Sequence, residues 1–264
     1  MIEIEICSLN KNELSKLAAN TRVIINTVGP YSKFGEPVIE ACINNGTHYF
    51  DVTGESPWTL DMIKKYDSQA KVKKTIIIPQ IGVDSAPADL LSWSLATHIR
   101  RTLNASTKDV VFSLYNMKGA PSGGTLGTVM TLFDVYSLQQ IGEASKPWVH
   151  SPIGPPATVN TDPSPSLMER ILGVRVVRDL GTLTTNIQGA VDRTQVHRTW
   201  GLLDGGKYYG DKFRFQPYMN ARNLLTGALI HLTIIIGALA LIISPVRTLL
   251  KRFIYQPGEG PSKE

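Results

Sequence analysis

The side chains that could do chemistry gather first between Asn26 and Tyr31, directly after the apolar run Val23-Ile24-Ile25. A second polar group, from Asp51 to Glu55, follows another run rich in apolar residues. In open parallel sheets, ligands bind beyond the carboxyl ends of the strands. If both runs are parallel strands, the two groups lie at one edge, where they could bind a polar ligand such as a nucleotide. The candidate binding residues are Asn26, Thr27, Val28, Gly29, Pro30 and Tyr31.

The elements around these residues read as one β–α–β unit. The β-branched run 22–28 is typical of a parallel strand buried on both faces, and Gly29-Pro30 ends it. Apolar residues at helical spacing then predict a helix over 37–43, with Pro37 in its first turn and a stop at Asn44-Asn45-Gly46. Residues 48–53 read as the next strand. Because this order is common in α/β domains, spacing alone leaves a purely structural role open.

For several single residues, the sequence allows either a functional or a structural role. Asp51 and Glu55 could bind ribose or shape a pocket, and a helix-capping or solvated role fits them equally well. Tyr31 could stack near a nicotinamide ring or pack in the core. Asp84 and Ser85 are better helix caps than substrate ligands. His48 and His197, alone in strand-like patterns, read as ordinary half-buried residues, and no catalytic acid or base is named.

The remaining elements are predicted from the same patterns. We expect strands over 2–6, 75–79 and 110–117, helices over 11–19, 89–103 and 125–136, a proline-rich loop over 147–165 and a strand over 189–202. The glycines at 123, 124 and 127 come too late in the chain to serve as a phosphate-binding turn.

The sequence of residues 26–55 resembles that of the saccharopine dehydrogenase-like oxidoreductases related to trans-acting enoyl reductases. Residues 82–89 resemble that family's "GFDSxPSD" pattern, and residues 122–125 match its "SGGT". Arg198 to Gly201, Tyr209-Gly210 and Phe213 to Phe215 resemble its C-terminal segment. Each motif is weak alone, but the ordered set covers nearly the whole chain.

The resemblance implies a nicotinamide cofactor, NADP or NAD, with Asn26 to Tyr31 as cofactor-binding residues. It also implies a Gly-rich phosphate turn within two earlier β–α units of roughly 30 residues each, which this sequence does not contain. We expect cofactor binding only if those units are present. Three explanations stay open: an incomplete gene model, which we favour, a truncated paralogue without catalysis, or a partner that supplies the missing half.

Composition narrows the class of protein. The chain has 264 residues, 42% hydrophobic and 19% charged, which is ordinary for a folded protein of more than one unit. The net charge of +5 comes without a nucleic-acid-binding module or a dense basic run, so we expect proximity to a membrane and no nucleic-acid partner. Cys7 and Cys42 read as small core residues in a reducing compartment. The start of the chain is not typical of a secretory signal, and no Cys/His spacing of the metal-site type occurs.

Residues 224–246 form an apolar stretch without a formally charged side chain, long enough for the roughly 20 residues that a membrane span needs. Arg247, Lys251 and Arg252 follow it. If it spans, the positive-inside rule places the C-terminus in the cytosol and the cofactor domain across the membrane. A shallow insertion bent near Gly237 or Ser244-Pro245 avoids that conflict, and a buried core helix is the remaining alternative.

We therefore predict an α/β fold: a partial Rossmann-type parallel sheet followed by an α+β domain and a C-terminal hydrophobic helix. The expected parts are residues 1–90, 91–222, a membrane segment at 223–246 and a basic, then disordered tail at 247–264. The resemblance implies an NAD(P)H-dependent oxidoreductase acting on a lipid-like, enoyl-type substrate at the cytosolic face of a lipid droplet or the endoplasmic reticulum. A homodimer is one possible assembly. The alternative is a catalytically inactive, membrane-anchored paralogue that acts as an interaction module.

Overall fold

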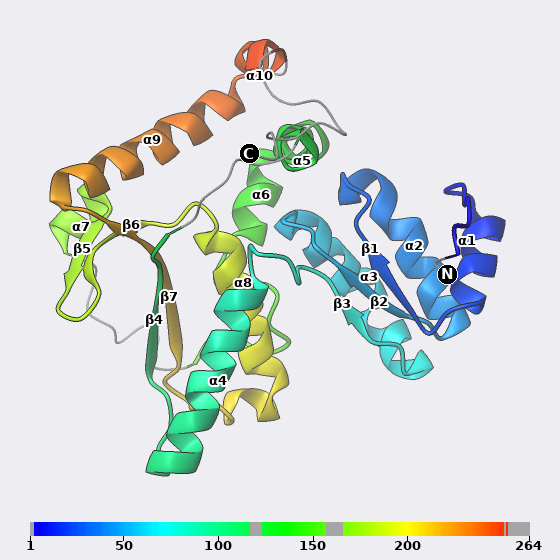
Figure 1. Cartoon of the computed structure of the whole chain (residues 1–264), viewed down its shortest axis with the longest axis horizontal. Helices are drawn as coiled ribbons and strands as arrows, with labels where there is room; N and C mark the ends of the chain where they lie inside the picture. The colour runs from blue at the N-terminus through cyan, green and yellow to red at the C-terminus, as the bar shows by residue number, and fades with distance from the viewer. Residues whose placement is uncertain (1–2, 117–122, 157–165, 251, 253–264) are drawn as a thin grey trace. The chain divides into compact units, whose positions relative to one another are not determined.

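The computed structural model describes residues 3–116, 123–156, 166–250 and 252, and it divides into two compact units. Unit 1 comprises the described residues up to Val83 together with 123–141. Unit 2 comprises 84–116 and the described residues from Gly142 onward. The division falls within the short helix α6 (Leu138–Ala144). The α/β class predicted from the sequence is confirmed, since helices alternate with a parallel sheet in unit 1 and accompany a mixed sheet in unit 2 (Figure 1).

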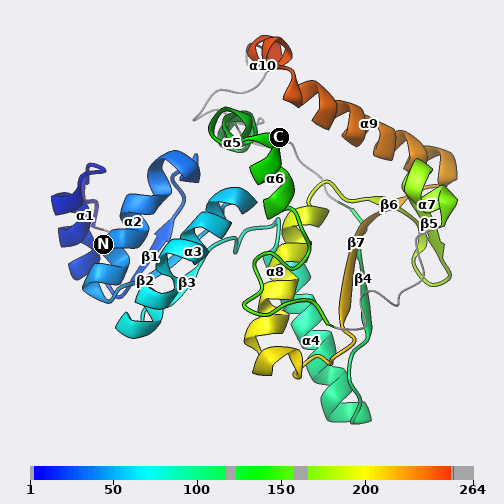
Figure 2. The same cartoon turned by 180° about the vertical axis from the view of Figure 1, so that it is seen from behind.

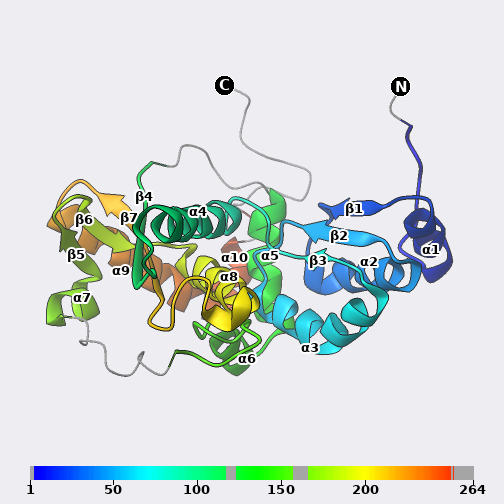
Figure 3. The ribbon, with the colours of Figure 1, turned by 90° about the horizontal axis from the view of Figure 1, so that it is seen from below.

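Unit 1 is a three-stranded parallel sheet in the order β1-β2-β3. Figure 3 shows helices α2 and α3 together on one side of these strands. The core forms there, around Tyr49, Trp58 and Ile39. The elements of this unit are α1 (Lys11–Ala19), β1 (Val23–Asn26), α2 (Tyr31–Asn45), β2 (His48–Asp51), α3 (Ser56–Lys73), β3 (Ile77–Ile78) and α5 (Gly123–Val135).

Local signals explain where several of these helices begin and end. Asn10 caps α1 by accepting the backbone N–H of Glu13 through its side chain. Gly46 ends α2 in the left-handed conformation, and the amide of Thr47 then donates to the carbonyl of Cys42. The helix at 11–19, the strands within 22–28, 48–53 and 75–79 and the stop at Gly46 are therefore confirmed.

Two expectations for unit 1 are wrong. Residues 3–6 form no strand, and Ile4 and Ile6 are exposed to 90% and 95%, because no described strand takes up their backbone hydrogen-bonding groups. Pro37 does not lie in the first turn of its helix. The helix α2 begins earlier, at Tyr31, because a distant carboxylate binds its first amides.

Unit 2 holds a four-stranded mixed sheet in the order β4-β7-β6-β5, with β4 and β7 parallel and the other pairs antiparallel. A second core of aromatic and aliphatic side chains, among them Trp200, Tyr209 and Phe213, lies in this unit. Its elements are α4 (Ala86–Leu103), β4 (Asp109–Leu114), α7 (Leu167–Leu172), β5 (Val174–Val177), β6 (Gly181–Thr185), α8 (Gly189–Leu202), the 3-10 helix η2 (Asp204–Gly206), β7 (Arg214–Ala221), α9 (Leu224–Ile242) and α10 (Ser244–Leu250).

The strand predicted over 189–202 is wrong, because these residues form the helix α8. The error has a physical cause: α8 buries polar side chains such as Asp192, Thr194 and His197, so the hydropathy pattern does not follow its buried face. Strands β5 and β6 had no counterpart in the sequence analysis. The strand near 110–117 and the helices near 89–103 and 125–136 are confirmed. The predicted loop over 147–165 lies partly outside the described residues.

The predicted C-terminal hydrophobic helix is α9, followed by α10 after a break at Ile243. Figure 2 shows α9 starting beside β5, β6 and α7 and then extending away from the sheet. The break lies next to Ser244-Pro245, one of the two bends that the sequence suggests, while Gly237 continues the helix. α10 also continues regular structure past residue 247, where the tail was expected to begin, and residues 253–264 of that tail lie outside the described residues.

Candidate functional site

The three parallel strands of unit 1 each end at or near a polar residue, and these residues lie at the same edge of the sheet. The register pairs Asn26 with Asp51, the last residues of β1 and β2, and Gln80 follows two residues after β3. All three side chains are buried, with exposed fractions of 6%, 0% and 1%. Ligands bind at the carboxyl edge of parallel sheets. In unit 1, this edge is lined by buried polar side chains.

Asp51 is the centre of a hydrogen-bond network at this edge. Its Oδ1 accepts the backbone N–H groups of Thr53 and Gln80 at 2.9 and 3.0 Å, and its Oδ2 accepts the hydroxyl of Tyr49 at 2.9 Å. The Nδ2 of Asn26 donates to the same Tyr49 oxygen. Burial raises the pKa of Asp51 to about 6, against the opposing effect of the two backbone donors. The network fixes the chain where it leaves all three strands.

Glu55 caps a helix, as one of its two readings proposed. Its carboxylate oxygens accept the backbone N–H groups of Tyr31 and Ser32 at 2.6 and 3.0 Å, at the first turn of α2. The side chain is completely buried. Amides at a helix N-terminus are a natural anion site, and here a carboxylate of the protein already occupies it.

The predicted binding residues divide into a buried group and an exposed group. Tyr31 is buried and donates its hydroxyl to the carbonyl of Asn26 at 3.0 Å. Its ring packs against Trp58, with ring centroids 5.7 Å apart. Burial, followed by the charge of Asp51, raises the pKa of Tyr31 to about 12. This geometry favours the core-packing reading of Tyr31.

The exposed group is the turn Thr27–Gly29, with Pro30 half-buried behind it. The amide of Val28 donates to Oδ1 of Asn26, which ties the turn to the edge. A Cβ placed on Gly29 would lie 3.5 Å from Oγ1 of Thr128 in α5. The structure thus brings the turn next to the helix that carries Thr125, the end of the "SGGT" motif, whose Ser122 lies outside the described residues.

Gln80 is the residue that sequence reasoning missed. Its carboxamide is buried, and neither Oε1 nor Nε2 has a hydrogen-bond partner among the described residues. The backbone of Gln80 is left-handed, with φ of 62°, which is uncommon for a residue other than glycine. No pattern in the sequence marks it, because its position at the edge depends on where β3 ends.

The two candidates of unit 2 at the start of α4, Asp84 and Ser85, differ in their contacts. Nε2 of Gln188 donates to Oδ1 of Asp84 at 2.6 Å, and burial raises the pKa of Asp84. Ser85 stands at the N-cap of α4, as predicted, but its hydroxyl makes no capping bond. Asp192, which the sequence analysis missed, has its pKa raised to about 7 by burial and then by the charge of Asp84.

The two histidines behave as structural residues. His197 lies in α8, stacks on Trp148 with ring centroids 3.6 Å apart and places Nδ1 2.7 Å from the carbonyl of Pro147. Burial lowers the pKa of His197 to about 3, so the ring is neutral at physiological pH. His48 is half-buried in β2 and accepts the amide of Ile76. Among the described residues, no three His, Cys, Asp or Glu side chains are placed to hold a metal ion.

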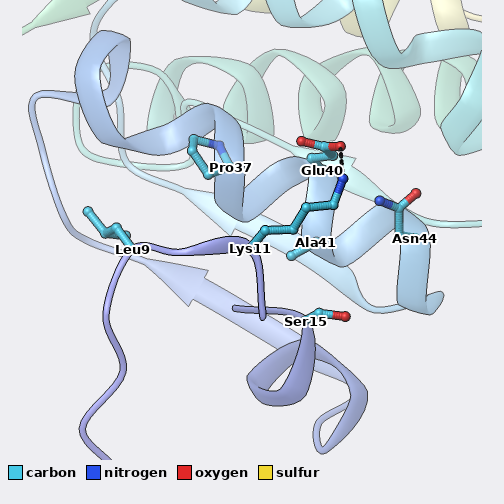
Figure 4. Close-up of a pocket in the computed structure, with 7 residues that line it drawn as sticks. All are labelled: Leu9, Lys11, Ser15, Pro37, Glu40, Ala41 and Asn44. Carbon is cyan, nitrogen blue, oxygen red and sulfur yellow. Dashed lines mark hydrogen bonds and ion pairs between the residues drawn. The ribbon is translucent and has the colours of Figure 1, made fainter. Parts of the chain in front are cut away.

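A surface pocket of about 280 Å³ lies elsewhere in unit 1, between the start of α1 and the outer side of α2 (Figure 4). Lys11 and Glu40 approach to 3.4 Å across it, and both side chains are largely exposed. None of the carboxyl-edge residues lines it. The pocket is therefore separate from the candidate site.

Comparison with known proteins confirms the resemblance. Residues 2–78 match the family model described as the saccharopine dehydrogenase NADP binding domain. A trans-acting enoyl reductase of Mycobacterium ulcerans is 29% identical over 272 residues, which cover 95% of this chain and 62% of that protein. A protein of Mycobacterium tuberculosis with the same type of name is 30% identical over 260 residues, covering 94% of this chain and 61% of the relative.

A third relative is a lipid droplet localized protein of Caenorhabditis elegans, 35% identical over 127 residues. That match covers 47% of this chain and 29% of the relative. The chain spans about three fifths of the length of the two mycobacterial relatives. No solved structure matches it significantly.

Proposed function

Taking the match of residues 2–78 to an NADP-binding domain as the premise, we propose that unit 1 contributes to binding NADP(H) in a lipid-directed oxidoreductase. The polar carboxyl edge is the observation that carries this proposal. The exposed turn Thr27–Gly29 would contact the cofactor, while Asn26, Pro30 and Tyr31 hold that turn in place.

The residues at the carboxyl edge suit the nicotinamide half of NADP(H) better than its pyrophosphate. The neutral carboxamide of Gln80, whose Oε1 and Nε2 have no hydrogen-bond partner among the described residues, fits a ribose or a carboxamide. The carboxylate of Glu55 at the start of α2 disfavours the negatively charged pyrophosphate there. We therefore assign this edge to the nicotinamide half, and the phosphates to residues outside this edge.

The substrate is inferred from the mycobacterial relatives. We propose reduction of an activated carbon–carbon double bond in a lipid-like molecule, in which the bound cofactor supplies the hydride and solvent or a side chain supplies the proton. The apolar helix α9 and the lipid droplet relative support a site of action at a membrane or lipid-droplet surface. We propose the cytosolic face of that surface, where the nicotinamide cofactor is available.

A non-enzymatic role is the second candidate. The occupied N-terminus of α2 favours it, because the amides of Tyr31 and Ser32 are not free to bind an anion. In this case the chain keeps the fold as a membrane-attached interaction module.

Titration of the protein with NADPH separates the two. Trp58 lies against Tyr31 behind the candidate turn, so a protein that also carries the Gly-rich phosphate-binding units should show saturable energy transfer from protein fluorescence to bound NADPH. Gly29→Leu fills the space beside Thr128 and should weaken NADPH binding at least tenfold, with an unchanged unfolding transition. Asn44→Leu alters the pocket of Figure 4 and should leave the affinity unchanged. A folded protein that shows no saturable signal supports the interaction module instead.

A further inference from the structure

The most exposed apolar element of the described chain is α9. This helix has a mean hydropathy of 2.3, contains no charged side chain and has only 6% of its most apolar stretch buried. Its exposed residues include Leu225, Leu229, Leu232, Ile235, Ile236, Leu239 and Ile242. Isolated exposed apolar residues are normal, but a whole helix of them marks an interaction surface.

The first turns of α9 are fixed to the sheet of unit 2. Gly227 is buried so closely that an added Cβ would approach Val174 to 2.8 Å, and its carbonyl accepts the hydroxyl of Thr184 at 2.7 Å. One turn later, Nδ1 of His231 lies 2.7 Å from Oγ1 of Thr185. These contacts tie the base of α9, up to His231, to the protein.

Beyond His231, residues 232–242 remain before the helix breaks. At a rise of 1.5 Å per residue, this free segment is roughly 17 Å long. The hydrocarbon core of a bilayer is about 30 Å thick, so one leaflet contributes about 15 Å. The free segment is therefore too short to cross a bilayer, so it stays on one side of the membrane.

A charge is fixed at the far end of this segment. The guanidinium of Arg247 in α10 donates to the carbonyls of Leu241 and Ile242, the last turn of α9, at 2.7 and 3.0 Å. The bonds satisfy carbonyls that the helix end leaves without intrahelical partners. Because a charged side chain in the bilayer centre is costly, this end belongs among the head groups.

We propose that α9 lies within a single phospholipid leaflet, with its base and the Arg247 end both at the head-group level. The occupant of the apolar surface is thus the acyl-chain region of that leaflet. Arg247 and Arg252 face anionic head groups, and Arg222 does so at the base. This placement rests on the proposed action at a lipid surface and adds the depth and topology of the contact.

The test uses the full chain with sealed vesicles of phosphatidylcholine and phosphatidylserine. Flotation should recover the protein with the vesicles. Ile236→Asp, at a position 64% exposed, should reduce the bound fraction at least tenfold. The matched control Ile187→Asp, at a position 67% exposed in the same unit, should leave it unchanged.

Topology is measured by labelling with a membrane-impermeant maleimide in a Cys7→Ser background, since the remaining Cys42 is buried. Thr248→Cys in α10 and Lys207→Cys, at an exposed position directly after η2, should both react without detergent. Protection of Thr248→Cys until detergent is added means that α9 spans the bilayer, which overturns the proposal.

Two other outcomes also overturn it. One is failure of the folded protein to float, and the other is a dimer in solution that Ile236→Asp dissociates, which assigns the surface to a second copy. NADPH titration without vesicles reports on the proposed function independently of all these results.

Discussion

At the scale of single residues, the candidate site depends on buried polar groups that bind backbone amides. Asp51 fixes the chain after β2 and β3, and Glu55 fixes the start of α2. Both carboxyl groups lie completely inside unit 1. A buried charge must be paired or hydrogen-bonded to be tolerated, and backbone N–H groups do this here. The same residues that shape the candidate binding edge therefore hold its loops in place.

The raised pKa of Asp51 predicts a pH dependence of stability. The folded carboxyl binds a proton at about pH 6 and the unfolded one near 3.8, so the folded state holds more protons between these values. The free energy of unfolding should therefore fall as pH rises from about 4 to 6, by up to roughly 1.4 kcal/mol per pH unit, and level off above.

Asp51→Asn removes the titrating group, and urea unfolding of both proteins between pH 4 and 7 measures the difference. Asn keeps an oxygen for the amides of Thr53 and Gln80. We expect the wild-type protein to lose stability over this range relative to the variant. A difference in unfolding free energy that stays constant with pH would contradict the assignment.

Glu55 predicts a stability effect through its hydrogen bonds to the first turn of α2. Glu55→Gln keeps one acceptor for the two amides and loses the charge at the helix N-terminus, at a cost of about 1–2 kcal/mol. Glu55→Ala leaves both amides of Tyr31 and Ser32 unpaired, and we expect about twice that loss in chemical denaturation. Glu40→Gln, at an exposed ion pair with Lys11, is the control and should change stability by less than about 0.5 kcal/mol.

At the scale of elements, the contact between α2 and α3 positions the candidate turn. Gly35 in α2 lies against the ring of Trp58 in α3, and Trp58 in turn packs on Tyr31. The two helices begin after four-residue connections that follow β1 and β2, so this contact sets the geometry of the carboxyl edge. The helices must therefore pack closely for the turn to hold its place.

Gly35→Ala tests this contact. A Cβ at Gly35 would approach Trp58 to 2.6 Å, closer than atoms can be, so we expect a loss of about 1–3 kcal/mol despite the better helix propensity of alanine. The control is Gly142→Ala in α6, where a Cβ meets nothing within 4 Å and should stabilise by up to about 1 kcal/mol. Thermal unfolding of the two variants distinguishes them, and equal shifts would mean that the α2–α3 contact is looser than described.

At the scale of the whole molecule, the sheet of unit 1 has one packed face and one open face in the described chain. The register places Ile24, Tyr49 and Ile77 toward the core of α2 and α3. The alternate residues Ile25 and Ile78 are exposed to 63% and 37%. Parallel sheets are usually covered on both faces. The expectation that residues 22–28 form a strand buried on both faces is therefore wrong for the described chain, because Ile25 faces the open side.

Adjacent substitutions in β1 test which face is packed. Ile24→Thr places a hydroxyl against the core and should cost about 2 kcal/mol, whereas Ile25→Thr keeps a β-branched side chain at an exposed position and should cost less than about 0.5 kcal/mol. Urea unfolding of the two variants under one condition gives the comparison. A large cost for Ile25→Thr would show that further protein covers this face in solution.

The structural features that the sequence alone determines are those that depend on interactions between neighbouring residues. The run of β-branched residues at 23–25, the glycine stop after α2 and the apolar stretch of α9 each act over a few neighbouring residues, so β1, the end of α2 and the exposed helix follow from sequence. The ordered motifs were also enough to place the chain beside its relatives. The turn at Thr27–Gly29 follows because a strand must end where Gly29-Pro30 interrupts its ladder.

Only the tertiary structure decides the features that join residues distant in sequence. Glu55 moves the start of α2 to Tyr31, a contact across 24 positions that no local pattern reports. The helix α8 replaces the predicted strand because several of its buried side chains are polar, and His197 among them binds the carbonyl of Pro147, 50 positions away. Gln80 reaches the candidate site only because β3 ends beside β2. Hydropathy follows burial when the core is apolar, and it fails where buried groups are held by hydrogen bonds that only the folded chain supplies.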